Sequence, residues 1–174
     1  MHKFYGHLKT ITTHKLGVTK LCFRCGLYKQ GLLHDLSKLS FIEFTSGVKY
    51  FQGNRSPIDK EKELKGYSLG WFHHKGRNKH HWEYWLDNAS DGIAPVKMPV
   101  KYVVEMYCDR SVASRIYMKE KYNDASAYEY FMNGYDHVLM HQETKDLLKN
   151  ILYYQKNHGT DETIRYIRKE ILHN

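Results

Sequence analysis

The chain is poor in residues that interrupt helices or cross-link secreted domains. Its 174 residues include only three prolines and three cysteines. Few prolines favour long uninterrupted helices, and an odd number of cysteines favours a reducing compartment over a disulfide framework. No apolar run approaches the roughly 18 residues that span a membrane, and the N-terminus has no apolar signal core. We therefore expect a cytoplasmic protein that does not enter a membrane.

The composition is that of a folded, basic protein. Hydrophobic residues make up 41% of the chain, and Lys and Arg outnumber Asp and Glu by 27 to 19, a formal net charge of +8. This length can bury a core in a single domain without disulfides. The basic balance suggests an anionic partner such as a phosphate ester, a nucleotide or nucleic acid, and the alternative is a basic surface with no dedicated ligand.

Apolar residues recur with helical spacing along nearly the whole chain, and no segment is a convincing strand. The first expected helix has one inward stripe, formed by His7, Ile11, His14, Val18, Leu21 and Cys25. Cys22 and Cys25 have the CxxC spacing, but they lie in this helical pattern with no βαβ unit nearby, so packing is favoured over a redox or zinc role.

Further helices are expected from capping and breaking signals. They are a short helix ending near residue 34, one from Ser40 to about Gln52, one opening at Ser56-Pro57, two short ones between Ser68 and Asn88, one from Pro99 to about Glu120, and two on either side of Gly159. The sequence thus predicts one all-α domain over residues 1–174, with a metal-site core at about 1–120 and C-terminal helices at 125–174.

The doublet His34-Asp35 stands in the run Gly31-Leu-Leu-His-Asp-Leu-Ser-Lys38. A helical interpretation places the doublet on an apolar wall. Burying a histidine next to an aspartate is costly unless something pairs with both. A divalent metal ion would do so, which makes the doublet a candidate metal site.

Asp109 is a second carboxylate whose burial would be costly, because it lies in another expected apolar helix. A buried carboxylate needs a cation or a large pKa shift, and the adjacent Arg110 points about 100° away around the helix. His14 lies in the middle of the inward stripe of the first helix. Together with the doublet, these residues form a set of two imidazoles and two carboxylates that we interpret as one metal site.

A histidine block, His73-His74-Lys75-Gly76-Arg77-Asn78-Lys79-His80-His81, follows. Its histidines are seven residues apart in pairs, so one of His73 and His74 and one of His80 and His81 could hold a second metal. The alternative is a basic loop that binds phosphate through Arg77 and Lys79. The two interpretations are compatible, because a phosphate could contact both.

The donor types indicate the metal and its use. Mixed imidazole and carboxylate ligands suit one or two ions of Mn, Fe, Co, Ni or Zn, and the absence of thiolates argues against a structural zinc site.

Lys38 shares a helical face with the doublet and could hold a substrate oxyanion. Glu105 could orient a ligand or replace one. Trp82 and Trp85 could line a pocket, although core packing is the simpler role.

The pattern His14-x3-Val18, Leu-Leu-His34-Asp35-x2-Lys38, the histidine block and Asp109 resembles the HD superfamily of metal-dependent phosphohydrolases. The stretches 28–38, 50–57 and 73–81 are similar to an uncharacterised bacterial family. The superfamily resemblance implies an all-α bundle around the metals. The implied ligands are His14, His34, Asp35 and Asp109 for the first metal, and Asp35, His74 and His80 or His81 for the second.

The resemblance implies a phosphohydrolase that acts on a nucleotide or other small phosphate ester through water activated by the metal. Asp35, Lys38 and Arg77 are the expected catalytic residues, with Lys38, Arg77 and Lys79 on the substrate phosphate. A di-iron oxygenase and a non-catalytic, metal-containing nucleotide or nucleic-acid binder are the alternatives. The chain has no Gly-Tyr-Pro signature of the cyclic-dinucleotide branch, so the substrate itself is not implied.

Overall fold

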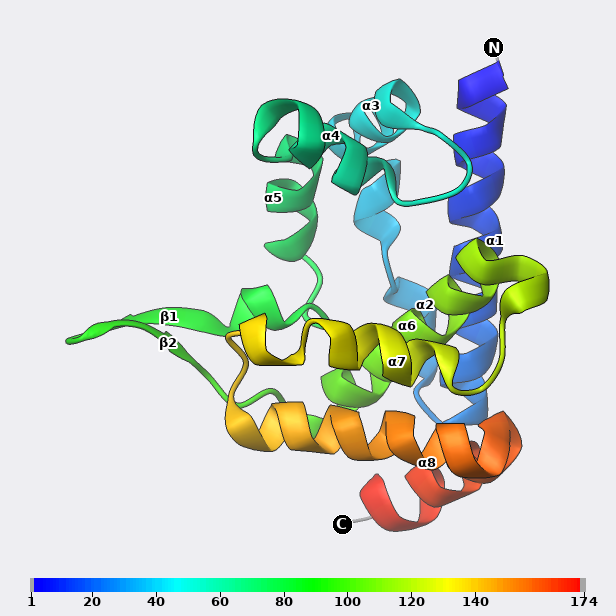
Figure 1. The fold of residues 1–174 in the computed structure, drawn as a ribbon, viewed down its shortest axis with the longest axis vertical. Helices are drawn as coiled ribbons and strands as arrows, with labels where there is room; N and C mark the ends of the chain where they lie inside the picture. Colours follow the sequence, from blue (N-terminus) through cyan, green and yellow to red (C-terminus); the bar gives the residue numbers. More distant parts are fainter. Residues whose placement is uncertain (1, 173–174) are drawn as a thin grey trace.

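The computed structural model describes residues 2–172 and is built almost entirely of helices, as expected (Figure 1). The elements are α1 (His2–Arg24), α2 (Tyr28–Leu33), η1 (Leu36–Leu39), α3 (Phe41–Tyr50), α4 (Pro57–Lys65), α5 (Leu69–Lys75), η2 (Trp82–Trp85), β1 (Leu86–Ala89), β2 (Gly92–Pro95), α6 (Val100–Met118), η3 (Lys119–Lys121), α7 (Ser126–Asn133), η4 (Tyr135–His137), α8 (Gln142–Tyr166) and η5 (Ile167–Ile171). The all-α prediction is confirmed.

Local chemistry sets several helix ends. The hydroxyls of Ser40, Ser56 and Ser68 each accept a hydrogen bond from a backbone N–H in the first turn of the following helix. Such caps satisfy N–H groups that have no partner within the helix. Gly159 interrupts α8 with a φ of 78°, a conformation that favours glycine. The caps at Ser40 and Ser56 and the break at Gly159 were predicted from the sequence.

The expectation that the chain has no strands is wrong. β1 and β2 form a short antiparallel hairpin that projects from the helical body (Figure 1). Ala89 pairs with Gly92, and Gly92 has a φ of 127°. Four residues on each side are too few for alternation to distinguish a strand from a loop. The eight-residue α7 was not predicted as a separate helix either, because two turns barely establish a helical period.

Helix α6 is the centre of the core. It packs against α1, α7 and α8, and its buried apolar residues are Val103, Val104, Met106, Tyr107, Cys108 and Val112. The three cysteines are free and buried in the same core, in agreement with the predicted packing role. Because α6 contacts the core with most of its surface, the few polar side chains in its middle are held in fixed positions.

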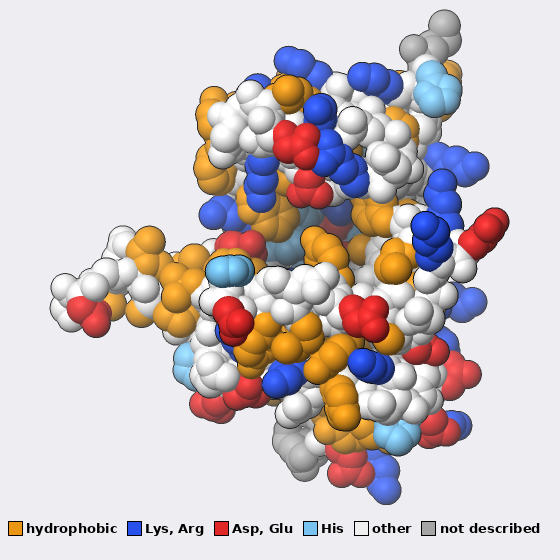
Figure 2. Space-filling view, viewed as in Figure 1, with side chains coloured by type: hydrophobic (Ala, Val, Ile, Leu, Met, Phe, Trp, Pro, Cys, Tyr) orange, Lys and Arg blue, Asp and Glu red, His pale blue; other side chains and the backbone are white. Residues whose placement is uncertain are grey.

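The helices form two groups along α1. Figure 1 shows α3, α4 and α5 at one end of the molecule and α7 and α8 at the other. Figure 2 shows a hollow between the two groups, with histidine side chains at its floor. Among residues 2–172, no helix has both the length and the apolar character needed to cross a membrane.

Candidate metal centre

Asp35 lies at the turn between α2 and η1. The sequence predicted the doublet on a helical wall, and this is wrong. His34 follows Leu33, the last residue of α2, and Asp35 has a left-handed φ of 54°. Aspartate tolerates this conformation better than most residues, but it remains uncommon outside glycine. Both side chains are nevertheless buried, with 1% of His34 and 5% of Asp35 exposed. The turn places the Asp35 carboxylate between the two groups of histidines.

The first donor set joins α1, the end of α2 and α6. Nε2 of His14 lies 2.9 Å from Oδ1 of Asp109 and 3.8 Å from Oδ2 of Asp35. Nε2 of His34 lies 3.4 Å from Oδ2 of Asp35 and 3.6 Å from Oδ1 of Asp109. Donor atoms of all four residues lie within 4.8 Å of one another. The structure therefore brings together the four residues that the sequence predicted as one site.

The second donor set lies on the other side of the same carboxylate. Oδ1 of Asp35 lies 3.3 Å from Nε2 of His74 and 3.4 Å from Nε2 of His80. Nε2 of His81 lies 2.9 Å from Nε2 of His74. Donor atoms of these four residues also fit within 4.8 Å. Asp35 thus offers one oxygen to each set.

The structure separates the four histidines of the block. His74 on α5 and the pair His80 and His81 after the turn belong to the second set. His73 does not, because its Nδ1 pairs with Oε1 of Glu43 at 2.5 Å. The turn that brings the pair back to His74 is held by Asn78, whose amide donates to the carbonyl oxygen of His74 at 2.8 Å.

Several donor atoms of the two sets have no geometrically suitable hydrogen-bond partner. They are Nε2 of His14, His34 and His80 and both carboxylate oxygens of Asp35, all buried. Two of these atoms still have a charged neighbour: Oδ2 of Asp35 lies 2.6 Å from Nζ of Lys38, and Nε2 of His14 lies 2.9 Å from Oδ1 of Asp109. Unsatisfied buried polar atoms are rare because each costs free energy. Their convergence, with imidazole and carboxylate donors and no thiolate, fits a borderline divalent metal ion in each set.

The charges in the cluster stabilise one another. Burial alone would raise the pKa of Asp35, but His34 and Lys38 hold it well below its usual range. Burial likewise would lower the pKa of His34, but Asp35, Asp109 and Glu105 raise it to about 10. The cluster is therefore a balanced set of cations and carboxylates, in which a divalent ion can take the place of a proton on nitrogen.

Two further carboxylates support the donor histidines. Oε1 of Glu105 lies 3.0 Å from Nδ1 of His34, and Oε2 of Glu43 lies 2.7 Å from Nδ1 of His74. The sequence predicted Glu105 as an orienting group or a ligand. The sequence analysis did not predict a role for Glu43 at the site, because the Ser40-x-x-Glu43 capping pattern already explained a glutamate at this position.

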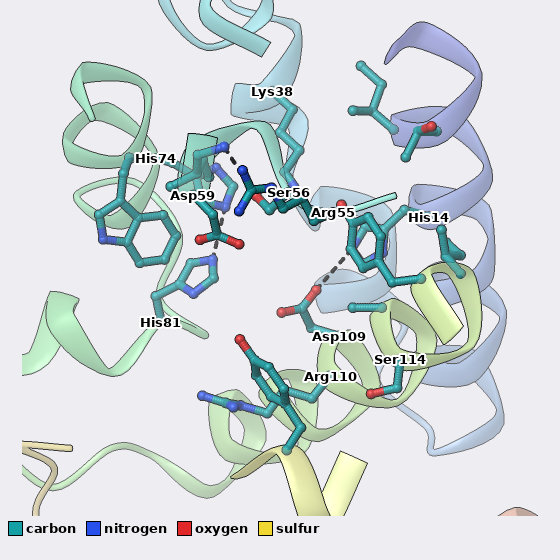
Figure 3. Close-up of a pocket in the computed structure, with 18 of the residues that line it drawn as sticks. His14, Lys38, Arg55, Ser56, Asp59, His74, His81, Asp109, Arg110 and Ser114 are labelled. Carbon is teal, nitrogen blue, oxygen red and sulfur yellow. Dashed lines mark hydrogen bonds and ion pairs between the residues drawn. The ribbon is translucent and has the colours of Figure 1, made fainter. Parts of the chain in front are cut away.

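A cavity of about 480 Å³ opens beside the donor sets. Figure 3 shows His14, His74, His81 and Asp109 around it, with Lys38 on one side and Arg110 on another. Its other basic lining residues are Arg55 and Lys62, and its aromatic and apolar walls include Trp71, Trp82, Tyr117, Tyr130 and Met118. Trp82 and Trp85 both pack against the core, which is the role that the sequence favoured, and Trp82 also lines this cavity.

Arg77 and Lys79 are not brought to this cavity. The Arg77 guanidinium donates to the carbonyl oxygen of His73 at 3.3 Å, and Nζ of Lys79 lies over the rings of Tyr84 and Tyr102. Neither side chain lines the cavity. The structure therefore does not bring Arg77 and Lys79 to this cavity, whereas Arg110, Arg55 and Lys62 line it together with Lys38. No local sequence pattern pointed to these three residues.

The comparisons with known proteins identify one family. Residues 3–154 match a family of unknown function (DUF5662), and the chain belongs to that family. No curated protein and no solved structure matches the chain. The matched range contains every residue of the two donor sets, so the candidate centre lies within the family's domain. The resemblance to the HD superfamily rests on the residues of the centre alone.

Proposed function

We propose that this chain is a metal-dependent phosphohydrolase of the HD type that acts on a nucleotide or other small phosphate ester. The observation that supports it best is the convergence of buried imidazole nitrogens from both donor sets on the two oxygens of Asp35, beside a cavity that His14, Asp109 and basic side chains line. Metal donors beside a partly apolar cavity that also has basic side chains suit a substrate that joins a phosphate to an organic group.

The ligands would be His14, His34, Asp35 and Asp109 for one ion, and Asp35, His74, His80 and His81 for another. A divalent metal held there supplies Lewis acidity, which polarises a phosphoryl oxygen and activates water at neutral pH. With four protein donors in each set, Mn, Fe, Co, Ni and Zn are all compatible ions.

The chain's own cations would hold the phosphate. Lys38 and Arg110 line the cavity near Asp109, and the Arg110 guanidinium also lies over the ring of Phe131. Charged donors that are already in place stabilise negative charge as it develops on a transferring phosphoryl group. Trp82 and Tyr130 line the same cavity and would pack against the organic part of the substrate.

The histidine-rich second set supports one alternative, a di-iron oxygenase, because three imidazoles are common ligands of iron. The net charge of +8 supports another, a non-catalytic binder of nucleotides or nucleic acid. Both alternatives keep the metal centre. The oxygenase differs from the proposal in the reaction at the metal ions, and the binder has no reaction.

Phosphate release tests the proposal. Wild-type protein loaded separately with Mn, Co, Ni and Zn would be assayed on a panel of nucleotides and phosphate monoesters, with Asp35→Asn as the matched control. We expect metal-dependent turnover that the control lacks. Iron binding with a visible charge-transfer band and oxygen uptake would favour the oxygenase. If the metal-loaded protein binds nucleotides but does not turn them over, the result would favour the non-catalytic binder.

A further inference from the structure

Glu105 makes an unusual pair of contacts. The same carboxylate oxygen, Oε1, lies 3.0 Å from Nδ1 of His34 and 3.1 Å from Nδ1 of His80. Glu105 is on α6, one turn before Asp109, and only 5% of it is exposed. His34 belongs to the first donor set and His80 to the second. One buried oxygen therefore contacts one histidine of each set.

These contacts determine where the protons are. An ionised carboxylate only accepts hydrogen bonds, so both Nδ1 atoms must carry the hydrogen. When a metal ion displaces the proton on Nε2, the lone pair of that nitrogen is then available to the ion. In both histidines Nε2 is buried without a hydrogen-bond partner, and it lies 3.4 Å from an Asp35 oxygen, Oδ2 for His34 and Oδ1 for His80. Glu105 thus directs both lone pairs at the centre.

We infer that Glu105 is a positioning residue shared by the two metal sites, which fixes His34 and His80 with Nε2 toward the metals. The inference rests on the metal centre of the proposed function and not on phosphoryl chemistry. Carboxylates that hydrogen-bond to ligating histidines commonly fix ring orientation and contribute a factor of about 10–100 in metal affinity. A carboxylate that contacts a ligand of each site should therefore change the metal affinity of both sites.

Glu43 provides the matched control. It also contacts two histidines, through Oε1 to His73 and Oε2 to His74. Only His74 belongs to a donor set. Glu43 and Glu105 are therefore similar in chemistry and burial, but Glu43 supports one site and Glu105 supports two.

There is a competing arrangement. His34, His80 and Glu105 have donor atoms close enough together to hold an ion themselves, and the nitrogens nearest the Glu105 oxygen are the two Nδ1 atoms. In that case Glu105 is a ligand, and the two rings coordinate through Nδ1 with the hydrogen on Nε2. The tautomers of His34 and His80 in metal-loaded protein distinguish the two arrangements.

The experiment combines two measurements on zinc-loaded protein. Long-range proton–nitrogen NMR of the histidine rings should show the Nδ1–H tautomer for both His34 and His80. Competition with a chromophoric chelator should show that Glu105→Gln weakens both zinc-binding steps by roughly 10–100-fold, whereas Glu43→Gln weakens one. Circular dichroism checks that both variants fold. If Glu105→Gln does not fold, the tautomers of His34 and His80 in the wild-type protein still test the inference.

An Nε2–H tautomer at either ring would overturn the inference in favour of Glu105 as a ligand. Unchanged zinc affinity in folded Glu105→Gln, or weakening of a single step, would overturn the shared role. None of these measurements needs turnover, so a wild-type protein that binds zinc without hydrolysing phosphate esters would refute the proposed reaction and leave Glu105's role intact.

Discussion

Nζ of Lys38 lies 2.6 Å from Oδ2 of Asp35, the same oxygen that faces His34 and the first donor set. The Lys38 side chain is 28% exposed, and it also lines the cavity. This lysine therefore contacts both the bridging carboxylate and the space beside it. In the metal-free protein its charge offsets that of Asp35, and with a phosphate in the cavity it is placed to bind an oxygen.

Replacing Lys38 by Ala should separate metal binding from catalysis. Metal content should stay at the wild-type level or rise, because the substitution removes a cation that contacts a ligand. Catalytic efficiency on the best phosphate ester should fall by roughly 10²–10³, the usual cost of losing one preorganised electrostatic donor. Elemental analysis and kcat/KM measure the two effects, and a loss of metal in this variant would contradict the assigned role.

Arg77→Ala should have little effect on catalytic efficiency. The Arg77 guanidinium faces the carbonyl oxygen of His73 and does not line the cavity. The same kinetic assay measures the variant beside Arg110→Ala, whose side chain does line the cavity. A large loss in Arg77→Ala with Arg110→Ala unaffected would show that the phosphate binds on the other side of the histidine block.

Asp35→Asn should abolish tight binding at both sites while the protein stays helical. Each Asp35 oxygen faces one donor set, so a neutral amide removes a charged ligand from both. The amide also leaves Lys38 and His34 without their counter-charge, so the variant should be less stable than the wild type although it still folds. Elemental analysis and circular dichroism measure the outcome. Full occupancy of either site in the folded variant would mean that Asp35 does not bridge them.

Glu61 should contribute a pH-dependent part of the stability. Its Oε2 accepts hydrogen bonds from Ser46 at 2.7 Å and Ser68 at 2.6 Å, and Oε1 pairs with Lys65. Burial alone would raise the pKa of this carboxyl, but these contacts hold it below its ordinary value of 4.5. The contribution is therefore present above that unfolded-state value and is lost as pH falls through the lower folded pKa.

Urea unfolding of wild type and Glu61→Gln measures this contribution. The variant should be less stable by about 1.5–3 kcal/mol at neutral pH, the range for hydrogen bonds to charged groups. The difference should shrink in acid, where the wild-type carboxyl is protonated. A difference that is the same at both pH values would contradict the charged, hydrogen-bonded state of Glu61.

Gly47→Ala should destabilise the contact between α1 and α3. A Cβ atom at Gly47 would lie 2.2 Å from Nε2 of His7, and this ring is buried beside Phe44 and Phe51. Overpacking of this kind typically costs about 1–3 kcal/mol. Gly134→Ala is the control, because a Cβ there meets nothing within 4 Å. Thermal unfolding of both variants tests it, and equal melting temperatures would contradict the close packing.

The sequence predicted the first donor set because burial makes its members conspicuous. Asp109 stands among apolar residues of α6 such as Tyr107 and Cys108, and His14 stands on the inward stripe of α1. Helical periodicity alone is enough to place such residues in the core. The sequence did not predict that Asp35 adopts a left-handed turn, because that conformation depends on how α2 and η1 pack rather than on a local pattern.

The second set and the cavity depended on tertiary structure. Helical periodicity does not tell which histidine faces inward next to a turn, so the sequence could not distinguish His73 from His74 as the ligand. The distinction comes from how α5 packs against Glu43 in the folded chain. The sequence also could not tell whether the Arg77 side chain points toward the cavity or away from it. Arg55 reaches the cavity from a loop far from α6 in sequence, and only the packing of α3 and α4 brings it there.

The metal content of the purified protein is the most direct test of the centre itself. The wild-type chain would be purified without chelators, analysed for elements, stripped, and then titrated with Mn, Fe, Co, Ni and Zn while its thermal unfolding is followed. We predict one to two divalent transition-metal ions per chain and a rise in melting temperature on reloading, because the ions bind donor atoms that only the folded chain assembles. Protein that contains none of these metals and shows no thermal shift with any of them would contradict the metal centre.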